Sequence, residues 1–363
     1  MHSRAALVVE PGRVEVTGIT FGPPREGEVI LRMEAAGVCR TDYKVSKGLQ
    51  SSRKPLYPML LGHEGAGVVE QVGSGVTHIE EGDRVAVGCR VPCGSCSMCR
   101  RNDPRRCNSS GARPPAVSLA SDGAGVDVPM GLGVYAERVP VDAGAVFRVS
   151  DAMPMTSASL LGCAVMTGTG AVFHTAQVWP GATTAVIGCG GIGLSTVQGA
   201  SLANASKVIA VDISDRKLDW ALSMGATHAV NSAREDAVAE VRALTGGEGV
   251  DFSFEAVGLG ATLSQALGML SYGGVATMIG VPPPGLKAEF EPSAFFRNTS
   301  TLMTTHGGEG IPAQDFPVLD SLYRSGRLNL DDMVTHTIPL SEMEKGFENL
   351  ETGSALRTVV VPD

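Results

Sequence analysis

The first third of the chain alternates short apolar segments with glycine and proline turn signals. Five segments are valine-rich or alternate apolar with polar residues, and each is bounded by Gly or Pro: 4–10, 26–38, 65–73, 82–88 and 133–141. A period of two that is interrupted at short intervals is typical of β-strands. The pattern therefore predicts an irregular, β-rich domain in this part of the chain.

The pattern changes near residue 165, where apolar runs begin to alternate with helical periodicity. Strands are expected at 183–188, 207–213, 228–231, 249–258 and 273–281, and helices at 193–204, 216–226 and 262–271. This alternation predicts a doubly wound parallel sheet with helices on both faces, an α/β fold. The segment PPPG at 282–285 interrupts the pattern, and we expect this domain to span residues 165–305.

The last part of the chain holds too few elements for a domain of its own. It contains an amphipathic stretch at 315–328 and an apolar strand at 357–361. We therefore expect residues 306–363 to return and complete the first domain, together with residues 1–164. No uninterrupted apolar run approaches the length of a membrane span, and the N-terminal sequence MHSRAALVVE has no leader character, so we expect a cytoplasmic protein.

Length and charge narrow the possible partners. A chain of 363 residues is too long for one ordinary core, which agrees with two domains. Its formal net charge is −9, and no Lys/Arg block is interleaved with aromatic residues. The overall field would repel a nucleic-acid backbone, so we expect no nucleic-acid partner.

Four cysteines lie close together in the first domain, spaced C-x2-C-x2-C-x7-C: Cys93, Cys96, Cys99 and Cys107. Four thiolates from one short loop can close a tetrahedron around Zn2+ and leave no position for water, so the predicted site is structural. Paired disulfides are the first alternative, but a long chain without a leader favours free thiols. An iron–sulfur cluster is the second, and it is disfavoured because no Pro follows the last Cys.

A glycine-rich turn marks a second site. Gly188, Gly190 and Gly193 form G-x-G-x-x-G between an expected strand and helix, and Asp212 ends the next strand. Such a loop brings backbone and a helix N-terminus to the pyrophosphate of a dinucleotide, and the acid bonds the adenosine ribose. The carboxylate would repel a 2′-phosphate, which favours NAD over NADP. Lys217, five residues further on, is a candidate for the same ribose.

A further set of potential ligands is scattered along the chain, and it carries a family resemblance. The signature G-H-E-x2-G-x5-G-x2-V is met without a gap, and the elements GVC-x-TD and SLLGC follow the same order; the signature residues are Gly62, His63, Glu64, Gly67, Gly73 and Val76. With the four-cysteine loop and the dinucleotide motif, the chain resembles the zinc-dependent alcohol dehydrogenases of the medium-chain dehydrogenase/reductase family from end to end. The resemblance implies a GroES-like catalytic domain and a Rossmann coenzyme domain.

The resemblance also implies a catalytic zinc, in addition to the structural one. Its ligands would be Cys39, His63 and Cys163, with Glu64 as a transient ligand behind the open position. Asp42 would orient His63. The implied chemistry is Lewis-acid activation of an alcohol and hydride transfer to the nicotinamide.

Other roles follow from the same resemblance. Thr41 would take the proton of the substrate. Lys44 stands where well-known members carry a relay histidine, so we expect the proton relay to differ here. Arg40 and Arg357 would grip the coenzyme pyrophosphate, and a fifth residue, Ile192, would pack behind the nicotinamide.

Cys89 falls where the family often has an aromatic wall of the substrate pocket. A small thiol there indicates a roomier pocket, which suits an aryl or branched primary alcohol. The leading hypothesis is thus an NAD-dependent zinc alcohol dehydrogenase with two Zn2+ per chain, acting as a homodimer or homotetramer.

Three alternatives stay open. A formaldehyde dehydrogenase acting on a thiol adduct would need a basic anchor, for which Arg113 is a poor candidate. An enal reductase is disfavoured because Thr41 and the zinc ligands are all present. A catalytically silent binding protein of the same fold would typically lack the catalytic zinc ligands.

Overall fold

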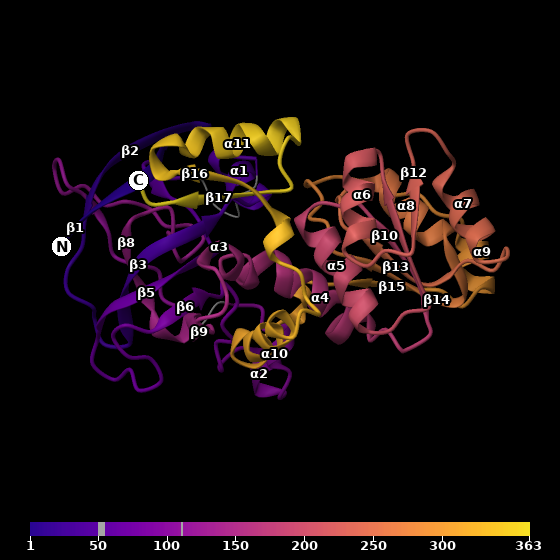
Figure 1. Cartoon of the computed structure of the whole chain (residues 1–363), viewed down its shortest axis with the longest axis horizontal. Helices are drawn as coiled ribbons and strands as arrows, with labels where there is room; N and C mark the ends of the chain where they lie inside the picture. The colour runs from indigo at the N-terminus through magenta and orange to yellow at the C-terminus, as the bar shows by residue number, and fades with distance from the viewer. Residues whose placement is uncertain (50–54, 110–111) are drawn as a thin grey trace. The chain divides into compact units, whose positions relative to one another are not determined.

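The chain divides into two compact units, and the computed structural model describes its residues 1–49, 55–109 and 112–363. Unit 1 comprises Met1–Cys163 and Ile311–Asp363, and unit 2 comprises Ala164–Gly310 (Figure 1). The sequence predicts boundaries after residues 164 and 305, and the structure has them after 163 and 310. The C-terminal segment therefore belongs to the same unit as the N-terminal part.

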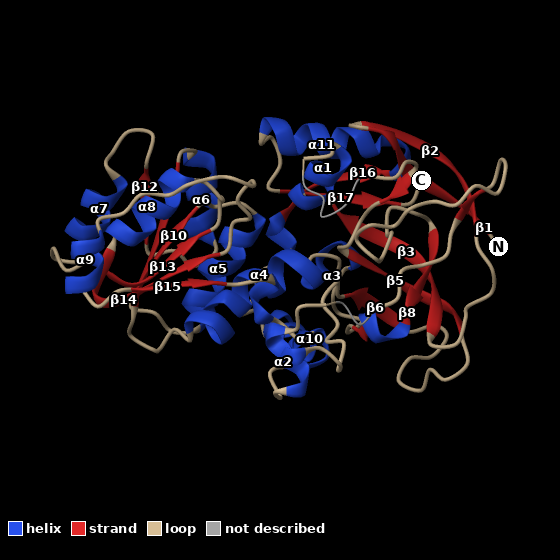
Figure 2. Ribbon diagram, turned by 180° about the vertical axis from the view of Figure 1, so that it is seen from behind, coloured by secondary structure: helices blue, strands red, loops and turns tan. Residues whose placement is uncertain are grey.

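Unit 1 is built on two sheets, which Figure 2 shows as red arrows. The smaller sheet has the order β4-β1-β2-β7 and consists of β1 (His2–Glu10), β2 (Arg13–Thr20), β4 (Met59–Leu60) and β7 (Ser118–Leu119). The larger sheet has the order β16-β17-β3-β5-β6-β9, with β8 also paired to β3. Its strands are β3 (Glu28–Gly37), β5 (Gly65–Val72), β6 (Arg84–Val87), β8 (Arg138–Asp142), β9 (Val146–Arg148), β16 (Val334–Pro339) and β17 (Arg357–Val361).

Strand β3 is the centre of the larger sheet. It pairs antiparallel with β5, β8 and β17, and Val29, Ile30 and Leu31 on it are fully buried. This apolar run is buried on both faces, and alternation returns only at Arg32 and Glu34, which are partly exposed. Because β17 pairs with the end of β3, the last strand of the chain lies beside the residues that follow Gly37.

The helices of unit 1 are short except for two near the C-terminus. The short ones are α1 (Arg40–Ser46), α2 (Ser97–Arg100) and α3 (Met155–Ala158), and the two longer ones are α10 (Pro312–Arg324) and α11 (Met343–Thr352). The 3-10 helices of this unit are η1 (Pro104–Arg106), η2 (Ala143–Ala145), η6 (Asp331–Met333) and η7 (Leu340–Glu342).

Unit 2 contains the doubly wound sheet that the sequence predicts. All its pairings are parallel, in the order β12-β11-β10-β13-β14-β15. The strands are β10 (Thr183–Ile187), β11 (Lys207–Asp212), β12 (His228–Asn231), β13 (Val250–Glu255), β14 (Leu270–Met278) and β15 (Thr301–Thr304). The helices are α4 (Met166–Gly170), α5 (Gly191–Leu202), α6 (Asp215–Ser223), α7 (Ala237–Leu244), α8 (Gly260–Gly268), α9 (Pro292–Arg297) and the 3-10 helix η5 (Gly307–Glu309).

Alternate residues of β10 pack into two different cores, one on each face of this sheet. Val186 joins a cluster with Val197 of α5, whereas Ile187 joins one with Val241 of α7. Helices thus cover both faces, as predicted. The strand order reverses between β10 and β13, and ligands of such sheets bind at the carboxyl ends of the strands at this point.

One helical run differs from the expectation that no apolar segment approaches the length of a membrane span. Met155–Ala176 is 22 residues long and apolar enough to qualify, but its apolar window is 83% buried inside the protein, as in a core helix. The run includes two π-helical stretches, η3 (Leu161–Val165) and η4 (Ala171–Ala176). π-Turns inside helices are frequent at functional sites, and η3 contains Cys163.

Candidate active site and metal centres

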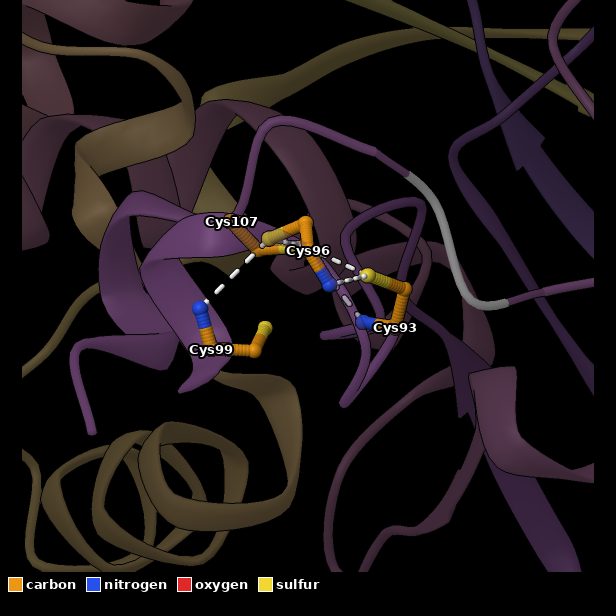
Figure 3. A group of neighbouring side chains, drawn as sticks. All are labelled: Cys93, Cys96, Cys99 and Cys107. Atoms are coloured by element: carbon orange, nitrogen blue, oxygen red, sulfur yellow. Dashed lines mark hydrogen bonds between the residues drawn. The ribbon is translucent and has the colours of Figure 1, made fainter. Parts of the chain in front are cut away.

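The four-cysteine loop forms a compact cluster on unit 1. One sulfur from each of Cys93, Cys96, Cys99 and Cys107 lies within 4.8 Å of every other (Figure 3). All are free thiols, so the disulfide alternative fails for this loop. The loop folds this way because Cys96 caps α2, whose first turn carries Cys99.

Backbone N–H groups point at these sulfurs. Cys93 Sγ accepts from Cys96 N at 3.3 Å, and Cys96 Sγ accepts from Cys99 N at 3.5 Å. The N–H groups of Ser95 and Cys96 lower the pKa of Cys93 to about 6. Hydrogen-bond donors that favour thiolates suit a site in which four sulfurs hold Zn2+. Four sulfur ligands would leave no coordination position for a substrate.

The scattered second set also comes together, entirely within unit 1. Ligand atoms of Cys39, His63, Glu64 and Cys163 lie within 4.8 Å of one another. Cys39 follows β3 and precedes α1, the His63–Glu64 pair lies between β4 and β5, and Cys163 lies in η3. The pairing of β3 with β5 brings the first two groups together.

His63 is oriented by Asp42. Its Nδ1 lies 3.1 Å from Asp42 Oδ1, and the two side chains are 2% and 0% exposed. Although burial lowers the pKa of His63, the charges of Asp42 and Cys39 raise it well above its ordinary value. An Nδ1–H directed at the carboxylate leaves Nε2 as the ring nitrogen for a metal. The predicted pair is therefore present as a contact.

Glu64 makes an unexpected ion pair. Its Oε2 bonds the guanidinium of Arg357 on β17, and both side chains are buried. The other oxygen, Oε1, is buried and has no hydrogen-bond partner in the described part of the chain. The structure places the guanidinium of Arg357 against Glu64, and the expected contact of Arg357 with the coenzyme pyrophosphate stays a prediction.

The donor set fits a zinc ion. Two thiols, one imidazole and a buried carboxylate oxygen without a hydrogen-bond partner meet here, and a buried polar oxygen that stays unsatisfied is costly. The hydrogen bond from Cys163, followed by the charges of His63 and Arg357, lowers the pKa of Cys39 well below its usual value against the effect of burial. A thiol held this way is ready to act as a thiolate ligand.

Helix α1 carries four of the predicted residues directly after Cys39: Arg40, Thr41, Asp42 and Lys44. Thr41 lies in its first turn, and Lys44 lies near its end with its side chain partly buried. Arg40 is exposed, and its Nη2 donates to the carbonyl of Leu350 at 2.9 Å. The structure thus anchors α1 to α11 and leaves the proposed coenzyme contact of Arg40 untested.

In unit 2 the glycine-rich turn has the form expected for phosphate binding. Gly188 has a φ of +92°, which favours glycine, and a Cβ at Gly193 would lie 1.7 Å from the carbonyl oxygen of Gly188. At Gly190, by contrast, a Cβ would meet no atom within 4 Å. The first glycine makes the turn, the third allows helix and strand to pack, and the second leaves backbone open to a ligand.

Asp212 ends β11 and holds this turn. Its Oδ2 accepts from Cys189 N at 2.8 Å, and its Oδ1 accepts from Ser214 N at 3.0 Å. Burial and the charge of Asp212 raise the pKa of Cys189, whereas Lys217 lowers it, so the ammonium of Lys217 acts on the same turn. The structure therefore gathers Asp212, Lys217 and the glycines.

Ile192 lies in the first turn of α5. It is partly buried and packs against the cluster that contains Val186 and Val197. Its side chain helps to fix the helix N-terminus, and nothing in unit 2 by itself tests the expected contact with nicotinamide.

Two further residues bear on the substrate. Cys89, just after β6, donates from Sγ to the carbonyl of Gly162 at 3.6 Å, which places it beside Cys163. Arg113 donates to the carbonyl of Glu26 at 2.6 Å and lies 3.8 Å from Glu28, a buried acid. Arg113 is thus committed to a local network, which weakens it as an anchor for an anionic adduct.

Sequence reasoning missed Tyr135. Its hydroxyl lies 2.9 Å from Asp42 Oδ2 and 3.1 Å from the carbonyl of Gly37, and the residue is 1% exposed. The only signal in the sequence was an aromatic residue in GVYAERV, a segment that reads as a strand. Separation by 93 positions from Asp42 hid the contact.

Comparison with known families agrees with this arrangement. Residues 25–151 match the alcohol dehydrogenase GroES-like domain, and residues 191–324 match the zinc-binding dehydrogenase domain. Together these matches cover Cys39, His63 and the four-cysteine loop in unit 1 and most of unit 2, whereas Cys163 lies outside both ranges.

Individual relatives are similar over their whole length. The NDMA-dependent alcohol dehydrogenase of Amycolatopsis methanolica is 33% identical over 371 residues, covering 99% of each chain. Alcohol dehydrogenase class-3 of Cereibacter sphaeroides is 33% identical over 378 residues, covering 99% of this chain and 100% of that protein. The crystal structure of benzyl alcohol dehydrogenase from Acinetobacter calcoaceticus superposes with a TM-score of 0.91, 28% identity and complete coverage of both chains.

Proposed function

This chain belongs to the zinc-dependent alcohol dehydrogenases of the medium-chain dehydrogenase/reductase family, and we propose that it interconverts a primary alcohol and its aldehyde with NAD as hydride carrier. The activity class, a zinc-dependent alcohol oxidoreductase that uses a nicotinamide coenzyme, follows from the family. The proposal beyond that class concerns the substrate, the preference for NAD and two zinc ions per chain. The observation that carries it is the cluster of the buried Cys39 and His63 with the partly buried Cys163, beside an unsatisfied oxygen of Glu64.

The residues of unit 1 divide the work at this cluster. Cys39, His63 and Cys163 would hold the catalytic zinc, which supplies Lewis-acid activation of the alcohol when bound. Asp42 keeps Nε2 of His63 directed at the metal by accepting from Nδ1. Glu64, fixed by Arg357, offers one oxygen as a transient ligand when the open position exchanges its occupant.

The proton of the alcohol needs a way out of a buried site. The hydroxyl of Thr41 would accept it, since Thr41 follows a zinc ligand by two residues at the start of α1. Lys44 lies one turn further along the same helix and would take part in passing the proton to water. Removal of the proton from the reacting oxygen allows the hydride to leave for the coenzyme.

Unit 2 supports NAD as the coenzyme. The open backbone at Gly190 and the N-terminus of α5 suit a pyrophosphate, and Asp212 ends the neighbouring strand. Each carboxylate oxygen of Asp212 accepts one backbone N–H and can accept a further bond from a ribose hydroxyl. A 2′-phosphate would meet this negative charge, so NADP should be disfavoured.

Cys89 supports a roomy substrate site. Its thiol contacts the carbonyl next to Cys163, so a small side chain stands beside the cluster of proposed ligands. We therefore favour aryl or branched primary alcohols, and the likeness to a benzyl alcohol dehydrogenase agrees with this choice.

Assembly as a homo-oligomer is part of the proposal. In the described sheet of unit 2, β15 is an edge strand, and the exposed fraction of Leu302 on it is 43%. Nearby in sequence Phe296 is 83% exposed. Edge strands with exposed apolar residues tend to pair with another chain, which favours a homodimer, or a tetramer built from it. Eight free cysteines suit a reducing compartment such as the cytoplasm.

Zinc analysis and a substrate panel test the function together. We expect two zinc ions per chain, and reduction of NAD in preference to NADP with benzyl or branched primary alcohols. Cys163→Ser should keep the structural zinc and the fold but lose activity, whereas Cys99→Ser should lower the resistance to unfolding. One zinc per chain in the wild-type protein, or a preference for NADP, would contradict the proposal.

A thiol-adduct formaldehyde dehydrogenase is the second candidate. The alcohol dehydrogenase class-3 of Cereibacter sphaeroides is as similar to this chain, at 33% identity, as the NDMA-dependent enzyme is. Formaldehyde oxidation that requires a low-molecular-weight thiol would establish it. Since Arg113 is engaged with Glu26 and Glu28, Arg113→Ala should not selectively weaken such a reaction.

A further inference from the structure

Tyr135 is fixed to the segment that leads into His63. The N–H groups of Gly133 and Val134 both donate to the carbonyl of Gly62, at 3.1 and 3.2 Å, and Tyr135 N donates to Leu61 O at 3.2 Å. A Cβ at Gly62 would lie 2.9 Å from Tyr135 N, so the two segments are in direct contact. These backbone hydrogen bonds fix Tyr135 next to His63 and so restrict where its phenol ring can lie.

The hydroxyl of Tyr135 is one of three hydrogen-bond donors that the structure places around the carboxylate of Asp42. Oδ1 of this carboxylate lies 3.1 Å from Gly62 N, Oδ2 lies 2.9 Å from Tyr135 Oη, and His63 Nδ1 lies 3.1 Å from both oxygens. The exposed fraction is 0% for Asp42, 2% for His63 and 1% for Tyr135. Water cannot replace a donor there without opening the core, so each donor matters for the buried charge.

We propose that Tyr135 is a positioning residue of the zinc site, acting through Asp42 on His63. With its hydroxyl in place, Asp42 has donors on both oxygens and keeps one orientation, so Nδ1–H of His63 has a fixed acceptor and Nε2 a fixed direction. Without the hydroxyl, Oδ2 keeps only the Nδ1–H group of His63, which lies equally close to Oδ1, so the carboxylate is held less firmly in one orientation. The proposal rests on the zinc site proposed above for Cys39, His63 and Cys163.

Tyr135→Phe tests this role because it removes one oxygen and keeps the ring. Outer partners of metal ligands typically change metal affinity by about 10- to 100-fold, and we expect about tenfold weaker zinc binding at this site. When a chelator is added, zinc should leave the site of Cys39, His63 and Cys163 faster in the variant than in the wild type. The rate of zinc release from the four-cysteine loop should be the same in both proteins. After Co2+ replacement, the visible absorption of the thiolate-bound metal should shift, which a general loss of stability would not cause.

Tyr57→Phe is the matched control. The hydroxyl of Tyr57 is buried too, but it has no hydrogen-bond partner in the described part of the chain. Its removal should leave zinc release and the Co2+ spectrum as in the wild type. A change of equal size in Tyr57→Phe would overturn the proposal, since loss of any buried hydroxyl would then suffice.

A double mutant separates action through Asp42 from an independent effect. If Tyr135 acts on His63 through Asp42, Tyr135→Phe should add little to the loss caused by Asp42→Asn. Additive losses, or wild-type zinc release and Co2+ spectrum in Tyr135→Phe, would overturn the inference. Failure of the zinc site itself would show differently, as a wild-type protein with only one zinc per chain.

Discussion

The guanidinium of Arg357 forms an ion pair with the carboxylate of Glu64, 293 positions away in the chain, and the two side chains are only 7% and 0% exposed. Glu64 follows a proposed zinc ligand, and Arg357 begins the last strand. The pairing of β17 with β3 brings the C-terminal strand to this site. The end of the chain is thereby part of the environment of the proposed zinc.

Removal of Arg357 should destabilise unit 1. Arg357→Met leaves the carboxylate of Glu64 buried without its cation, and such a break costs about 3–5 kcal/mol. Denaturant unfolding monitored by circular dichroism should show the loss. The control Arg324→Met removes an exposed arginine from its pair with the partly buried Asp320 and should cost less than about 1 kcal/mol. An unchanged stability with a raised KM for the coenzyme would instead support the pyrophosphate role.

Two glycines of the same turn should respond differently to alanine. In Gly193→Ala the new methyl would lie 1.7 Å from a backbone oxygen, so the turn must shift, and both stability and coenzyme binding should fall. In Gly190→Ala the methyl meets no atom within 4 Å, and φ is −82°, so the free protein should keep its stability. Its methyl would still stand where the pyrophosphate approaches, so NAD titration should show weaker binding. Equal stability losses in the two variants would contradict this assignment.

Asp212→Ser should relax the preference for NAD. The substitution removes a negative charge and a charged acceptor for a ribose hydroxyl, and such hydrogen bonds contribute about 1.5–3 kcal/mol, roughly 10- to 100-fold in kcat/KM. Steady-state kinetics with NAD and NADP would measure both effects. Asp215→Ser is the control, because Asp215 is exposed and bonds Asn231 and Arg234. If the coenzyme preference stays unchanged in Asp212→Ser, another group decides it.

Lys44→His should alter the pH dependence of turnover. Histidine in water has a pKa of about 6.5, so the variant would gain a relay group that titrates near neutral pH. The pH–rate profile of kcat should then acquire an added inflection near that pH. The control is Lys47→His. Lys47 is the C-cap residue of the same helix and pairs with Glu351, and its replacement should keep the wild-type profile. Coincident profiles of wild type and Lys44→His would show that position 44 takes no part in the relay.

Local patterns located much of the fold. The strand 228–231 agrees residue for residue with β12, and 357–361 agrees with β17, because each segment lies between clear turn signals. Among the elements that the sequence patterns did not predict are β2, β15, β16 and α11. Their polar and exposed positions weaken periodicity, since β2 and β15 keep few buried residues.

The candidate site shows the same division. Cys93 to Cys107 lie within one loop, so their spacing alone indicates a metal cluster, and the glycines of unit 2 likewise act through adjacent backbone. Glu64 and Arg357 could not be paired from the sequence, because each resembles a residue with another role. Tyr135 gave no signal either, since a buried tyrosine reads as core until its hydroxyl finds a partner.

The sequence by itself determined the classes of the two units, the four-cysteine loop and the dinucleotide turn, because those features depend on neighbours within a few residues. Only the tertiary structure decided which side chains surround His63. Asp42 comes from helix α1, Arg357 from strand β17, and Tyr135 and Glu64 from loops. Their contacts exist because antiparallel pairing across β3 brings these distant segments of the chain together. Because these groups are buried, each hydrogen bond and each charge there is stronger than it would be in water. No local sequence pattern shows this.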